Sequence, residues 1–230
     1  MTRKIMYIVM LAGFFLISCK GKHNPVETDT AEPAPTAEYI LTFTSTWSNT
    51  THPVDFPANA HFSGLVGATH NLDVVFWEEG QPASKGIKDM AERGLKDPLI
   101  EEVDFAIRQN NAGNVLSGGG LATSPDSVKL PFTISRQFPL ITVVAMLAPS
   151  PDWFVGVSGL SLLDDNQWTD QVTVPLYAYD AGTDNGVTYT SPDEATIPVE
   201  PIAKIEDVPF WVNNVLPVIG TFTITRQKTE

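Results

Sequence analysis

The stretch Leu140–Val157, which reads LITVVAMLAPSPDWFVGV, is the strongest indication of the fold. Its first part, Leu140–Ala148, is an unbroken apolar run of strand length, which is typical of a central strand covered on both faces. Two prolines follow, and the aromatic and β-branched residues after them predict another strand from Phe154 to Leu162. This stretch therefore predicts two consecutive strands of a sheet.

Other segments on both sides also have the composition of strands. They are Tyr39–Trp47, Val128–Arg136, Val172–Tyr179 and Gly220–Arg226. In the last segment, Phe222 and Ile224 alternate with threonines, which indicates one buried face and one solvated face. Strands of this kind, separated by turns rich in Pro, Gly and Asp, predict an all-β fold, namely an antiparallel β-sandwich.

Around residues 84–110 the pattern changes to that of helices. Ser84 is a suitable N-cap for a first helix, and Gly94 is a suitable residue to end it. A second helix is expected to begin at Asp97-Pro98, because proline is favoured in the first turn. We therefore expect one or two short helices to be inserted between the strands.

The N-terminus carries signals for export. Arg3 and Lys4 precede an apolar run from Ile5 to Ile17, which is the layout of a secretory signal peptide. A permanent helical span needs about 20 apolar residues, so this run is expected to be removed. The motif LISC ending at Cys19 resembles a bacterial lipobox. A plain signal peptide with a chance cysteine is the alternative. It is disfavoured because the only cysteine of the chain falls on the position that a lipobox requires.

This interpretation divides the chain into three parts. Residues 1–18 are a lipoprotein signal peptide, residues 19–37 are the lipidated Cys19 and a flexible stalk, and residues 38–230 are one folded domain. The protein is then exported and attached to a membrane only through its lipid anchor, in the cell envelope, at the outer membrane or on the cell surface. A net charge of −13 repels phosphate backbones, so nucleic acid is not an expected partner.

Two acidic segments are candidates for a shared metal site. In the first, DAGTDNG, Asp180 and Asp184 bracket a glycine directly after an expected strand. In the second, Asp152 stands between prolines and aromatic residues, where an isolated charge is costly unless it is paired. Calcium prefers carboxylate and other oxygen ligands, and a shared ion would satisfy Asp152. For the first segment taken alone, a solvated Asp-Gly turn is the alternative.

Several longer motifs resemble the spondin N-terminal domain, the module named from F-spondin and mindin. They are APSPDWFVGV at 148–157, DAGTD at 180–184, YTSP at 189–192, TWS at 46–48, THPVDFP at 51–57, AHFS at 60–63, GATHN at 67–71 and ASKG at 83–86. The resemblance implies a sandwich related to C2 domains, with Ca²⁺ bound in loops at one end. It also implies that Asp152, Asp180 and Asp184 are the metal ligands. Some family members have an acidic residue where this chain has Thr133, which leaves a fourth side-chain ligand open.

We therefore expect a calcium-binding surface module that is not an enzyme and that acts in adhesion or ligand binding, with an unidentified protein or glycan partner. One alternative is a metal-dependent hydrolase that uses the same acids, and another is a purely structural envelope lipoprotein. The sequence contains no nucleophile elbow, Walker loop or dinucleotide fingerprint.

Two other groups of residues are weaker candidates for a site. His52, His61 and His70 recur at equal intervals and could form a zinc triad. They fall in expected loops shared with a family that does not bind zinc, so hydrogen-bonded structural histidines are favoured. The five tryptophans could stack on sugars, but packing in the core is the commoner role of such side chains.

Overall fold

The computed structural model describes residues 35–228 of the chain. Cys19, the signal peptide and most of the predicted stalk lie outside these residues, and what the sequence indicates for them stays a prediction. Within the described part, no helix is long and apolar enough to cross a bilayer.

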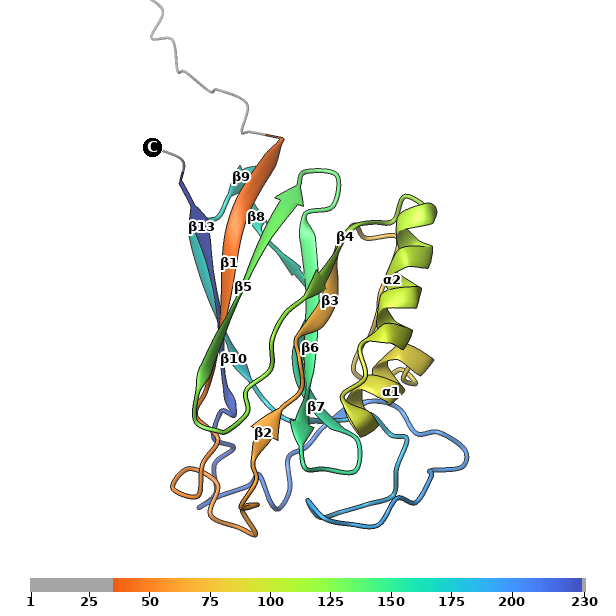
Figure 1. Cartoon of the computed structure of the whole chain (residues 1–230), viewed down its shortest axis with the longest axis vertical. Helices are drawn as coiled ribbons and strands as arrows, with labels where there is room; N and C mark the ends of the chain where they lie inside the picture. Colours follow the sequence, from red (N-terminus) through yellow and green to blue (C-terminus); the bar gives the residue numbers. More distant parts are fainter. Residues whose placement is uncertain (1–34, 229–230) are drawn as a thin grey trace, which may run out of the picture. The chain divides into compact units, whose positions relative to one another are not determined.

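One layer of the domain is a four-stranded antiparallel sheet in the order β10-β13-β1-β5 (Figure 1). Its strands are β1 (Thr36–Ser45), β5 (Ser127–Ser135), β10 (Gln171–Leu176) and β13 (Gly220–Gln227). In the register of β1 with β13, Phe43 lies opposite Phe222. Phe222 and Ile224 are buried and the threonines between them are partly exposed, which confirms the predicted two-faced strand.

The second layer is a sheet in the order β12-β11-β7-β6-β3-β4, with β2 also paired to β6. Its strands are β2 (His61–Phe62), β3 (Val66–His70), β4 (Ala112–Ser117), β6 (Leu140–Ala148), β7 (Trp153–Ser161), β11 (Tyr179–Asp180) and β12 (Ala203–Lys204). Every residue of β6 is buried, as the apolar run predicted. A small hairpin of β8 (Leu163–Asp164) and β9 (Gln167–Trp168) follows β7.

The central strand is apolar on both faces because each face contacts a different core. Ile141 and Val143 belong to the cluster between the two sheets, whereas Val144 and Met146 belong to a cluster shared with the helices. Figure 1 shows the helices on the outer side of the sheet that contains β3 and β6. The predicted antiparallel sandwich with two short helices is therefore confirmed.

The two helices are α1 (Lys85–Arg93) and α2 (Asp97–Arg108). The Ser84 hydroxyl accepts the backbone N–H of Ile87, and Gly94 adopts a left-handed conformation with φ 64° at the end of α1. Both caps agree with the sequence prediction. Glu102 of α2 joins the helices, because its carboxylate accepts the Ser84 hydroxyl at 2.7 Å and the Gly86 N–H at 2.7 Å.

Two details of the predicted strands were wrong. β1 begins at Thr36, within the predicted stalk. The expected strand Val172–Tyr179 is divided, because Leu176 pairs with β13 of one sheet and Tyr179 pairs with β7 of the other. The chain changes sheets without a break in its apolar pattern, so the sequence shows no boundary there.

β2 and β3 lie where loops were expected, and β3 contains a glycine that weakens the strand pattern. Gly67 is required by packing, because a Cβ atom there would lie 1.8 Å from the Thr142 carbonyl oxygen. His61 and His70 therefore lie in strands β2 and β3, not in the expected loops.

Candidate metal site

Strand pairing brings the two acidic segments together. Asp152 lies in the turn between β6 and β7, and Asp180 ends β11 opposite Trp153 of β7. The backbone N–H of Ala181 donates to the Asp152 carbonyl oxygen at 3.2 Å. Figure 1 shows the β6–β7 turn and the blue segments that follow β11 at the same end of the sandwich. The candidate site is thus built from loops at one end of the domain.

Asp152 is the most buried acid of the site, with 0% of its surface exposed. Its Oδ2 atom accepts the backbone N–H of Thr183 at 2.7 Å, the Thr183 hydroxyl at 3.1 Å and the Asp184 N–H at 3.1 Å. Its Oδ1 atom is also buried and has no hydrogen-bond partner among the described residues. The Oδ2 atom of this carboxylate therefore accepts three hydrogen bonds, and the Oδ1 atom accepts none among the described residues.

The electrostatics of the site favour a cation. The pKa of Asp152 is raised to about 7, because burial and the nearby charge of Asp180 raise it by more than the three hydrogen bonds lower it. Burial also raises the pKa of Asp180, whereas the Gly182 N–H and the indole of Trp153 lower it. No ion pair within residues 35–228 involves Asp152, Asp180 or Asp184. Two neighbouring carboxylates thus repel each other where a positive charge would be stabilising.

Asp184 orders the loop after β11. Its Oδ1 atom accepts the Gly186 N–H at 2.8 Å, and its Oδ2 atom accepts the Glu194 N–H at 2.8 Å. Its own backbone N–H is one of the three donors to Asp152. Asp184 is therefore a direct neighbour of Asp152, but both of its side-chain oxygens already accept hydrogen bonds.

The three aspartates are adjacent without forming a complete ligand set. Within residues 35–228, no three acidic, histidine or cysteine side chains are arranged so that they could hold a metal ion together. Calcium also takes backbone carbonyl and water oxygens among its six to eight ligands. The unpaired Oδ1 atom of Asp152, and the Asp180 oxygen that does not accept the Gly182 N–H, fit that donor set. Metal binding by these residues stays a prediction.

Thr183 is the residue of this site that sequence reasoning missed. It supplies two of the three hydrogen bonds to Asp152, and it is only 1% exposed. Its position inside the DAGTD motif, beside two candidate ligands, is the signal that could have identified it. The possible fourth position, Thr133, lies in β5 of the other sheet, where its hydroxyl donates to Glu38 at 2.7 Å.

Aromatic side chains pack next to these loops. Trp153 contacts Tyr189 and Phe210 at ring distances of 5.3 and 5.2 Å, and Tyr189 contacts Trp47 at 5.6 Å. Core packing is confirmed for four of the tryptophans, namely Trp47, Trp77, Trp153 and Trp168. Trp211 differs from them, because 42% of its surface is exposed.

The three histidines do not form a site together in the described part of the chain. Each has its own local contact: His52 with the Thr51 hydroxyl, His61 with the Asn59 carbonyl, and His70 with the Asn71 carbonyl and the Thr142 hydroxyl. Burial lowers the pKa of both His52 and His70. These contacts agree with structural histidines rather than a zinc triad.

Together, the two sheets, the helices on one face and the acidic loops at one end define an all-β sandwich module with a candidate ion site in its loops. The sequence model of the family described as Spondin_N matches residues 37–213, a range that includes all three aspartates. The chain belongs to the spondin N-terminal domain family, as the sequence motifs predicted.

Known proteins with similar sequences include both spondins. Spondin-2 of Homo sapiens is 38% identical over 173 residues, which cover 74% of this chain and 52% of that protein. Spondin-2 of Rattus norvegicus is 35% identical over 175 residues, or 74% of this chain and 53% of the relative. Spondin-1 of Gallus gallus is 38% identical over 178 residues, or 74% of this chain and 22% of the relative. The chain thus spans about half of the length of Spondin-2 and less of Spondin-1.

Proposed function

We propose that this protein is an exported, lipid-anchored surface module that binds calcium and serves in adhesion or ligand binding. The observation that carries the calcium proposal is the buried, unpaired Oδ1 atom of Asp152 beside the Asp180 carboxylate. Membership of the spondin family supports an extracellular adhesion or ligand-binding role. The partner is a protein or a glycan, and the strongly acidic chain disfavours nucleic acid.

In this proposal Asp152 and Asp180 are the principal carboxylate ligands, and Asp184 is the third. Each carboxylate oxygen has about two acceptor sites, so the backbone bonds of Asp184 leave room for a further contact. Calcium would supply the positive charge that the buried Asp152 carboxylate and the half-buried Asp180 carboxylate, which repel each other, lack. Thr183 holds Asp152 in place through its N–H and its hydroxyl. The loops that carry these residues would then be ordered together.

Calcium is expected to stabilise the purified protein and to have no such effect on the Asp152→Asn variant. The amide oxygen of asparagine can keep the three hydrogen bonds of Oδ2, but the charge is lost. At a calcium concentration about 100 times the dissociation constant, the gain is about 2.7 kcal/mol, or about 5–10 °C in melting temperature for a domain of this size. An affinity of about 10⁻⁴–10⁻³ M is expected for an extracellular site. Thermal unfolding with calcium or with a chelator measures the effect.

The matched control for this measurement is Asp164→Asn, which neutralises an exposed acid in the β8–β9 hairpin. It should respond to calcium like the wild type. Magnesium, which requires a tighter octahedral shell, should stabilise the protein less. An equal calcium shift in wild type and Asp152→Asn would contradict the proposed site, because the ion would then act elsewhere.

The lipid anchor is tested separately at Cys19. Replacing Cys19 by Ser in the full-length chain is expected to move the protein from the membrane fraction to the soluble fraction, since the thiol that carries the acyl chains is gone. Metabolic labelling with a radioactive fatty acid should mark the wild type and not the variant. Labelling that persists in Cys19→Ser would reject the anchor.

A further inference from the structure

The outer edge of β7 is open along most of its length. β11 pairs with β7 only opposite Trp153 and Phe154. Beyond them, no strand of the described chain pairs with residues 155–161 on that side. Strand β10, which lies nearby, belongs to the other sheet and pairs only with β13 within residues 35–228. An unpaired strand edge presents a row of backbone donors and acceptors to a partner.

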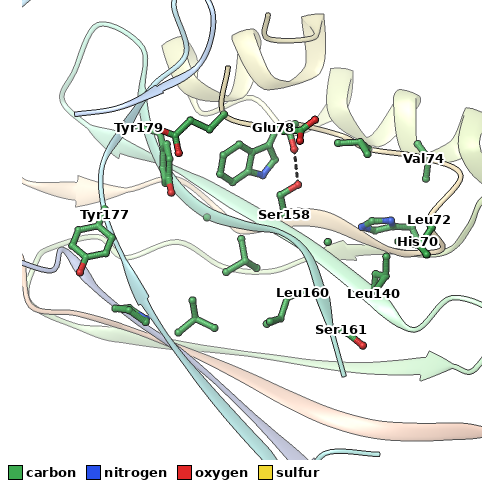
Figure 2. A pocket seen from close by; sticks show the side chains of 18 residues that line it. His70, Leu72, Val74, Glu78, Leu140, Ser158, Leu160, Ser161, Tyr177 and Tyr179 are labelled. Atoms are coloured by element: carbon green, nitrogen blue, oxygen red, sulfur yellow. Dashed lines mark hydrogen bonds between the residues drawn. The ribbon is translucent and has the colours of Figure 1, made fainter. Parts of the chain in front are cut away.

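A groove of about 630 Å³ runs along this open edge (Figure 2). Residues 156–161 of β7 line it, together with Val174 and Pro175 of β10. Its apolar surface comes from side chains such as Leu140, Val157 and Leu160. A Cβ atom added at Gly159 would meet no other atom within 4 Å, so the space on the side-chain side of that residue is open. The groove is large enough to hold several side chains of a ligand.

Trp77 forms part of the wall of the groove and contacts β7. It is one of the lining residues and is only 7% exposed. Its indole Nε1 is buried and has no partner among the described residues, whereas its backbone carbonyl accepts the Ser158 hydroxyl (Figure 2). The contact with Ser158 thus holds the segment that carries Glu78 and Glu79 against β7.

The rim of the groove is acidic and aromatic. Glu78 and Glu79 are exposed lining residues, and neither is in an ion pair within the described residues. Lys204 is the cation near this rim: its ammonium lies 5.5 Å from the Tyr177 ring and 2.7 Å from Glu206. The charge of Glu79 already acts on Lys204, and Glu79 accepts the Lys204 backbone N–H at 3.4 Å, but neither rim carboxylate is in an ion pair that would exclude a positively charged ligand group. Tyr177 and Tyr179 also line the groove (Figure 2).

We infer that this groove binds an extended peptide that adds a strand to β7, with apolar side chains toward the groove and basic side chains toward Glu78 and Glu79. Such strand addition takes its affinity from main-chain hydrogen bonds and its specificity from alternate side chains. The edge of β10 is less suited than that of β7 to pairing with a peptide, because Pro175 has no N–H to donate. None of the three aspartates lines the groove, so this inference goes beyond the calcium proposal and does not require it.

The test uses the purified protein and a capped nine-residue peptide of alternating valine and lysine, labelled for fluorescence anisotropy. We expect saturable binding that weakens as salt is raised, since the rim charges are exposed to solvent. A peptide with glutamate in place of lysine should not bind. A lysine peptide with methylated nitrogens at its five central residues should also fail, because it keeps its charge but loses its backbone donors.

Matched variants separate the groove from general electrostatics. The double variant Glu78→Gln/Glu79→Gln is expected to bind the lysine peptide at least about fivefold more weakly, as two exposed ion pairs permit. The control variant Glu101→Gln/Asp104→Asn removes two exposed carboxylates from α2 and should bind like the wild type.

Three outcomes would overturn the inference. They are no binding of the lysine peptide at about 1 mM, equal binding of the methylated peptide, and protein dimers in sedimentation that the peptide disperses. The last result would assign the edge to a second copy of the chain. Because calcium stabilisation is measured without peptide, a failure here leaves the calcium proposal standing, and the reverse also holds.

Discussion

The calcium-free protein is expected to lose stability as the pH rises from about 4 to about 8, and Asp152→Asn is expected to remove much of that loss. The pKa of Asp152 is raised from its usual 3.8 to about 7 in the folded state. Folding therefore favours the protonated carboxyl, whose contribution to stability is fully present below about pH 4 and disappears as the pH passes about 7. Since a tenfold change in acidity corresponds to about 1.4 kcal/mol, the effect is about 4 kcal/mol at most.

The physical cause is the geometry of one side chain. The ionised form gains three hydrogen bonds at Oδ2 but leaves a buried negative charge at Oδ1, next to Asp180. Asparagine carries no charge and can present its amide oxygen to the same three donors. At pH 8 without calcium, Asp152→Asn should consequently be more stable than the wild type.

Urea unfolding at several pH values, with a chelator present, measures this difference. Subtracting the curve of Asp152→Asn from that of the wild type removes most of the contribution of His52 and His70, whose lowered pKa values act in the opposite direction. Asp164→Asn, at an exposed position, should parallel the wild type. Parallel curves for the wild type and Asp152→Asn would show that this carboxyl titrates normally in the folded protein.

Truncating Phe222 to alanine is expected to lower the free energy of unfolding by about 3–5 kcal/mol. Phe222 is 0% exposed in β13, and its ring lies 5.3 Å from that of Phe43 in β1. The substitution removes apolar contacts between the two sheets and leaves a cavity that the surrounding strands can fill only partly. Since domains are stable by about 5–15 kcal/mol, the variant should be strongly weakened but still able to fold.

Thr223→Ala is the matched control, because the next residue of the same strand faces the other side and is partly exposed. It should cost no more than about 1 kcal/mol, the range of strand propensities. Guanidinium unfolding of both variants compares the two faces of β13. Similar losses for Phe222→Ala and Thr223→Ala would contradict the assignment of a single buried face.

The fold class and the main strands could be predicted from the sequence. Local composition reveals a strand when each of its faces is either buried or solvated along its whole length. This holds for the apolar run Leu140–Ala148, which is buried on both faces, and for the alternation around Phe222, where one face is buried. The caps at Ser84 and Gly94 are also local, since they act within one helical turn. The family followed from long motifs that keep their order along the chain.

The contacts between these elements could be seen only in the folded structure. Asp152 and Asp180 are neighbours because β11 pairs with β7, and the three hydrogen bonds to Oδ2 of Asp152 come from Thr183 and Asp184 in the loop after β11. The groove exists because β11 covers only the first two residues of β7. Such features depend on register and strand length between segments that are distant along the chain, and no local pattern encodes those distances.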